Sequence, residues 1–181
     1  MKLFKYEGYK VVISEEAYVL KPFKKLWDRD KTKNKDRATM ELGYIYFFLD
    51  PRSDYQYLTD PEDRDKAIRE GEGIPEKWKK DKIMQEAMDF YDSFKTPSAL
   101  LLEDTRVAVD KLRQLLRDID LEEKDDKGKP VYTLNTITST IKQIPDLVRG
   151  LNEAEKAIND EIKEQGKMRG QGEKTLFEDG L

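Results

Sequence analysis

Cysteine and histidine are both absent from this 181-residue chain, and each absence excludes a kind of chemistry. Without cysteine there is no disulfide, no thiolate ligand for a metal and no thiol nucleophile. Without histidine the chain lacks the side chain that most often serves as a general base or binds a transition metal. Nothing of that kind is available to activate its few serines. We therefore expect a protein that is not an enzyme and that holds no cofactor and no metal.

Four further features are missing. The sequence has no apolar run of about 18 residues, which a membrane-spanning helix would need, and Met1–Glu7 lacks the apolar segment of a secretory leader. The G-x-G motif at 71–73 neither follows a predicted strand nor opens a helix, so it does not indicate a phosphate-binding loop. The net charge of −4 gives no overall basic footprint for nucleic acid.

Charge is what the chain has in excess. Charged residues make up 40% of the sequence and apolar residues 37%, whereas globular chains have about 25% and about 45–50%. This composition favours an elongated shape or helices with wide solvent-facing sides. Residues 21–37 alone carry eight Lys or Arg and three Asp. That stretch is either a solvated turn between helices or a contact for an anion or an acidic partner.

The spacing of apolar residues predicts a mainly α fold: a helical bundle with a long C-terminal helical hairpin, a short N-terminal extended segment and a flexible C-terminal tail. Residues 1–13 form the extended segment, and the predicted helices cover about 14–28, 34–50, 60–70, 81–95, 96–120 and 134–165. Capping side chains followed by proline, as at Asp60-Pro61 and Thr96-Pro97, mark helix starts. We expect one bundle domain over 1–165 and a tail over 166–181.

The helix over 34–50 is the expected centre of the core. Ala38, Leu42 and Ile45 share one of its faces, and further apolar residues cover the other sides. A helix that is apolar nearly all round must be surrounded by protein. Trp78, in a later linker, is also expected to fill the core.

The two last helices, over about 97–120 and 134–165, are expected to pack as a long antiparallel hairpin. Apolar residues in the first alternate at spacings of four and three, with a second stripe one residue over. This pattern predicts a wide buried face and not a narrow coiled-coil seam. The polar stretch 122–130 between them predicts a turn, because its acids are adjacent and do not alternate as in a calcium loop.

The tail, 166–181, is spaced by glycines and cannot form a fold by itself. Two interpretations are open: a disordered terminus, or an extended segment that becomes ordered on a neighbouring subunit. In the second case Leu176 and Phe177 form the apolar anchor. Lys167 and Arg169 complete the candidate partner-binding residues.

Three stretches carry a resemblance to a known family. They are KDRATMELGYIYFFLDPRS at 35–53, IPEKWKKD at 74–81 and the helix start TPS at 96–98. In this order they resemble a small virion protein of tailed bacteriophages, in particular the head–tail connector, or ring, proteins of crAss-like phages. The resemblance covers roughly residues 15–120, and the order and spacing of the stretches are more specific than any one of them.

The resemblance implies a structural role without catalytic residues. Such proteins form a homo-oligomeric ring below the portal, expected to be twelvefold, that joins capsid to tail and extends the DNA channel. The implied partners are the portal protein and other ring or tail proteins, while DNA passes without specific binding and no membrane is involved. The chain would be made in the host bacterial cytoplasm and located at the portal vertex of the virion. Two alternatives stay open: another tail-assembly or accessory virion protein, or a cytoplasmic helical regulator that binds one partner.

Overall fold

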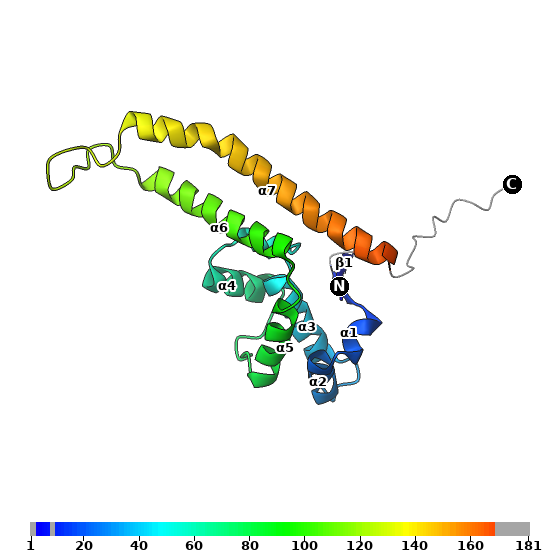
Figure 1. The fold of residues 1–181 in the computed structure, drawn as a ribbon. Coiled ribbons are helices and arrows are strands. Elements are labelled where there is room, and N and C mark those ends of the chain that lie inside the picture. The colour runs from blue at the N-terminus through cyan, green and yellow to red at the C-terminus, as the bar shows by residue number, and fades with distance from the viewer. Residues whose placement is uncertain (1–2, 8–9, 169–181) are drawn as a thin grey trace. The chain divides into compact units, whose positions relative to one another are not determined.

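The computed structural model describes residues 3–7 and 10–168 and is mainly helical, which confirms the predicted fold class (Figure 1). Two short strands pair antiparallel at the N-terminus, where the sequence predicts an extended segment. No helix in this described part of the chain is long and apolar enough to span a bilayer. In chain order the elements are β1 (Phe4–Glu7), β2 (Lys10–Ile13), α1 (Glu15–Val19), α2 (Lys21–Arg29), α3 (Asp36–Leu49), η1 (Asp54–Tyr57), α4 (Pro61–Gly71), α5 (Lys82–Asp92), α6 (Pro97–Asp118) and α7 (Leu134–Met168).

The elements fall into two compact units. Unit 1 takes the chain up to Tyr46, the segment Lys79–Phe94 and the chain from Lys156 onward. Unit 2 takes the segments Phe47–Trp78 and Lys95–Glu155. The chain therefore passes from one unit to the other four times, and α3 and α7 each contribute residues to both units.

Helix starts follow the signals in the sequence. The Asp60 carboxylate caps α4 by accepting hydrogen bonds from two backbone N–H groups of the first turn, at 2.8 and 3.0 Å. The Thr96 hydroxyl caps α6 by accepting one hydrogen bond, from the backbone N–H of Ala99 at 3.3 Å. A proline follows each cap because its fixed φ suits the first turn. Ser14 stands at the cap position of α1, but its side chain makes no capping hydrogen bond.

The centre of unit 1 is α3, as the sequence predicts. Every residue from Glu41 to Tyr46 is buried. Phe4 of β1 lies against Phe23 of α2 and Tyr91 of α5, with ring centroids 5.9 and 5.2 Å apart. Burial of these aromatic rings joins the strand hairpin to two helices that are distant in the sequence.

Unit 2 contains a loop that turns back on the end of α3. The Ser53 hydroxyl donates to the carbonyl of Phe47 at 2.8 Å, and the Gln56 amide donates to that of Phe48 at 2.9 Å. These side chains satisfy carbonyls that a helix leaves without partners at its C-terminus. Trp78 is buried, as predicted, and the Arg69 guanidinium lies 5.0 Å from the centre of its ring.

The wide buried face predicted for the first of the two long helices is wrong over most of its length. In Figure 1, α6 and α7 run side by side in opposite directions, and Arg106 of α6 pairs with Glu155 of α7 at 2.8 Å. Ala99 and Leu102 of α6 are buried, but no residue over 103–157 is. Two neighbouring helices cover only the rows that face each other, so the rest of a wide apolar stripe stays in contact with solvent.

The turn predicted over 122–130 is confirmed. The Asp125 carboxylate accepts hydrogen bonds from the backbone N–H groups of Lys127 and Lys129 at 2.9 and 2.8 Å. Gly128 has a φ of 75°, a conformation that costs glycine little. A β-bridge between Lys124 and Pro130 closes the turn at its base.

The last helix ends later than predicted. Because α7 continues to Met168, the first three residues of the predicted tail, 166–168, are helical. The rest of that tail, 169–181, lies outside the described residues.

Replacing Ile45 with Asp should unfold the protein, because Ile45 is completely buried and an unpaired carboxylate in its place would lose its hydration. We expect a loss of more than about 4 kcal/mol in the free energy of unfolding, measured by urea titration. Val19→Asp is the matched control, because Val19 is exposed, and it should cost less than about 1 kcal/mol. Equal stability of the two variants would contradict the assigned core.

Candidate assembly surface

Most of the basic stretch 21–37 is engaged within unit 1. Its five cations with acidic or carbonyl partners are Lys25, Arg29, Lys31, Lys35 and Arg37. Lys25 pairs with Glu86 at 2.6 Å, for example, and Lys35 donates to carbonyls at the end of α2. Little of this charge is left for an anion or an acidic partner, so the structure favours a structural role for most of it.

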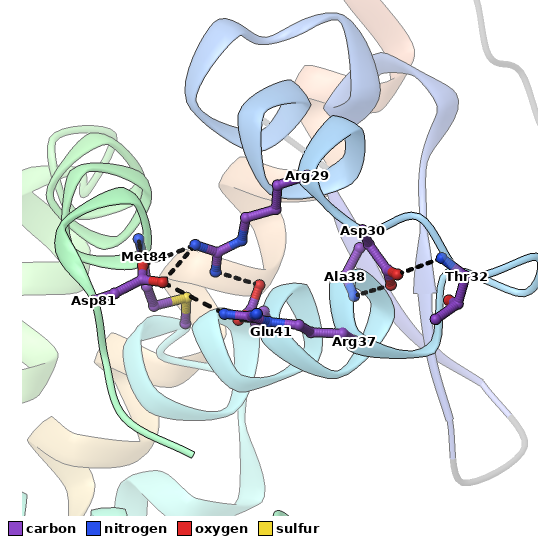
Figure 2. Close-up of polar contacts among 8 residues, drawn as sticks. All are labelled: Arg29, Asp30, Thr32, Arg37, Ala38, Glu41, Asp81 and Met84. Atoms are coloured by element: carbon purple, nitrogen blue, oxygen red, sulfur yellow. Dashed lines mark hydrogen bonds and ion pairs between the residues drawn. The ribbon is translucent and has the colours of Figure 1, made fainter.

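Four charged residues of unit 1 form a network that joins three helices (Figure 2). Arg29 of α2 donates to both carboxylate oxygens of Asp81 at 2.8 and 2.6 Å, and lies 2.6 Å from the Glu41 carboxylate of α3. Arg37 donates to Glu41 at 2.9 Å and to Asp81 at 3.4 Å. The Glu41 side chain is 0% exposed, so its charge is tolerated only because guanidinium groups surround it.

Asp81 has a second role as the cap of α5, where it accepts a hydrogen bond from the N–H of Met84 at 2.9 Å. Hydrogen bonding from Arg29 is the main reason that the pKa of Asp81 lies below its ordinary value. Both carboxylates of the network are thus engaged by cations, which makes it a device that holds helices together. Among the described residues, no group of three or more potential ligands is placed to bind a metal ion.

Asp30 holds the start of α3 in the same region. Its carboxylate accepts hydrogen bonds from the backbone N–H groups of Ala38 at 3.0 Å and Thr32 at 2.9 Å (Figure 2). These bonds, that from Ala38 first, lower the pKa of Asp30 from 3.8 to about 2. A buried carboxylate therefore stays ionised because the backbone solvates it.

The hairpin of unit 2 carries an exposed apolar surface. Along α7 we define the α7 row as Leu134, Ile141 and Val148, which are 71%, 51% and 43% exposed. Along α6 we define the α6 row as Leu101, Ala108 and Leu115, whose leucines are 61% and 43% exposed. Residues within each row are seven apart, which is the spacing of two helical turns.

Each helix of the hairpin also has a partly covered row beside the open one. Ile137, Ile144 and Leu151 of α7 are half-buried, while the α7 row next to them is exposed. Scattered apolar residues on a protein surface need no explanation, whereas apolar residues that gather along one side of a helix are typical of interaction surfaces. The open rows are therefore the candidate functional surface.

Of the four predicted partner-binding residues, the structure describes the backbone of Lys167 alone. Lys167 lies in the last turn of α7, whereas Arg169, Leu176 and Phe177 lie outside the described residues. The sequence predicts a buried face that includes the α6 row, so the open surface was not expected. The signal was present, since a stripe wider than one row cannot be covered by one neighbouring helix.

Replacing Glu41 with Gln should destabilise unit 1 by about 3–5 kcal/mol, because it leaves two guanidinium groups without a buried counter-charge. Urea unfolding followed by circular dichroism measures this loss. Glu76→Gln is the matched control: Glu76 is exposed, and its substitution should change stability by no more than about 0.5 kcal/mol. A Glu41→Gln variant as stable as the control would show that the network contributes little.

Acid should remove the contribution of Asp30. Its folded-state pKa of about 2 lies below the ordinary 3.8, so the folded protein binds fewer protons, and the stabilisation is lost as pH falls through that interval. Asp30→Asn should be less stable than wild type near neutral pH, and the gap should narrow as the pH approaches about 3. Urea unfolding at several pH values tests this, and a gap independent of pH would contradict it.

Comparisons with known proteins add nothing to this geometry: no family model, no curated protein and no solved structure matches the chain.

Proposed function

We propose that this chain is a structural subunit of a tailed-bacteriophage virion, which forms a ring below the portal, joins capsid to tail and extends the DNA channel. The hairpin carries the proposal: over 103–157 no residue is buried, although the α6 and α7 rows are apolar. Covering such apolar rows with other protein removes them from water, which lowers the free energy of the system. The stretches at 35–53 and 74–81 resemble connector proteins, and this resemblance is why we propose the ring below the portal as the assembly.

A ring suits the arrangement of the open surface. Each subunit of a ring meets two neighbours through two different surfaces. The hairpin offers two rows on two helices, so one row is available for each neighbour. The portal and other ring or tail proteins would then contact the parts of the subunit that the rows leave free.

The distribution of charge agrees with a channel that lets DNA pass. Gripping a duplex requires clustered Lys and Arg that are free to contact phosphates. Here the net charge is −4, and five of the eight cations of 21–37 already have partners within unit 1. Such a surface would line a channel without holding the DNA.

The proposal is tested in purified virions of the phage that encodes the chain. Mass spectrometry should detect the chain in the particles, and immunogold labelling should place it at the single vertex that carries the tail. Label elsewhere on the particle would favour another tail-assembly or accessory virion protein. Presence in infected cells but absence from particles would overturn the virion role and favour a cytoplasmic regulator.

The tail gives a second test of the same role. Replacing Leu176 and Phe177 together with Ser should leave the melting temperature unchanged and weaken assembly about tenfold, because the apolar anchor is lost. Sedimentation of the purified chain with its portal measures assembly. Gln171→Ser with Thr175→Ser, polar changes in the same segment, is the control. Normal assembly by both variants would show that the anchor is not used.

A further inference from the structure

We propose that the α7 row of one copy packs against the α6 row of the next copy, so that the subunits join through unlike faces of the hairpin. This inference rests on the proposed function, because it names the contact that builds the ring. It assigns an occupant to each open row, and that occupant is a helix of the same chain.

The spacing of the rows points to a helix as the occupant. Leu134, Ile141 and Val148 repeat at seven residues, and so do the members of the α6 row. Residues seven apart drift by only about 20° per repeat around a helix, so each row stays on one side of its helix and can pack along a row of a second helix. Since the chain itself carries two such lines on two helices, a second copy supplies a matching partner for each.

Charges beside the rows select unlike pairing. Lys142 and Arg149 each follow a residue of the α7 row directly, and both are exposed. Asp104 and Asp118 each stand one helical turn after a leucine of the α6 row and are also exposed, with Lys111 between them as the single opposing charge at these positions. Two α7 rows would bring cations together and two α6 rows would bring acids together, whereas unlike rows place cations beside acids.

Arg149 is available for such a contact. Its pairing with Asp146 at 3.3 Å joins two side chains that are 68% and 75% exposed, and a pair of this kind contributes little. Arg149 can therefore exchange Asp146 for an acidic residue of a neighbouring copy at little cost in free energy.

The open apolar area is divided between two contacts. Ten large apolar residues between Leu100 and Val148 remain exposed: Leu100, Leu101, Val107, Leu115, Leu121, Val131, Leu134, Ile141, Leu147 and Val148. Their exposed fractions correspond to roughly 800 Å² in total, so each contact would take about half of it and polar surface would supply the rest of an interface of standard size. The rows form the regular part of this area, and the charged residues beside them form its rim.

Charge reversal in purified protein tests the pairing. One variant carries Lys142→Glu and Arg149→Glu, and a second carries Asp104→Lys and Asp118→Lys. Each alone should place like charges across every contact and raise the apparent dissociation constant of assembly about tenfold or more. An equimolar mixture of the two should assemble again, because contacts between the two variants regain opposite charges. Lys66→Glu with Lys77→Glu, exposed positions of unit 2 outside the hairpin, controls for net charge.

Cross-linking gives an independent measurement, since the natural chain has no cysteine. Ile141→Cys and Leu115→Cys variants, mixed and treated with a short bismaleimide, should form a 141–115 link between different chains. Links of 141 to 141 in the first variant alone should be at least about tenfold less abundant, as expected for unlike faces.

Several results would overturn the proposal. Wild-type assembly by both charge variants would show that the rows are not the contact, and dominant 141–141 links would show that like faces pair. If assembly were lost only on deletion of residues 169–181, the tail and not a helix of a second copy would be what covers the rows. A chain that assembles through the rows yet is absent from virions would keep this inference and overturn the proposed function.

Discussion

One neighbouring helix can bury only about one row of apolar side chains, so a wider apolar stripe needs more than one neighbour. This constraint governs the C-terminal half of the chain. Helices α6 and α7 both carry stripes more than one row wide, and each has the other alongside. The result is one half-buried row and one open row on each helix, with no buried residue over 103–157. The hydrophobic effect that folds unit 1 is left incomplete here, and association between copies can complete it.

In unit 1, by contrast, the buried charged residues have partners within the unit. Two of its carboxylates are buried and have partners: Glu41 lies between Arg29 and Arg37, and Asp30 is held by backbone N–H groups. Such networks fix the geometry of helices more than they add to stability, because desolvation offsets much of the attraction. Unit 1 and the hairpin of unit 2 thus differ: polar contacts satisfy the buried charges of unit 1, whereas the hairpin leaves apolar rows in contact with solvent.

The sequence predicts features that depend on neighbouring residues, but not contacts between residues that are distant in the chain. Local chemistry was sufficient for the caps at Asp60 and Thr96 and for the turn around Asp125. Periodicity was sufficient to place the core at α3. Neither could show that Glu41, a charged residue within the most apolar helix, is paired with Arg29 and Arg37. Nor could they show that both arginines also bind Asp81, forty residues after Glu41. Nor could periodicity alone tell a row buried within the chain from a row that the chain leaves open, because both have the same spacing.

The interleaving of the two units affects how the protein can be made. Unit 1 draws on residues near the N-terminus and on the segment that begins at Lys156, which includes the buried Ile158. A ribosome must therefore synthesise most of the polypeptide before unit 1 has all of its parts. A nascent chain that stalls before Lys156 would lack part of the core of unit 1. For the same reason, any continuous fragment that contains all of one unit also contains residues of the other.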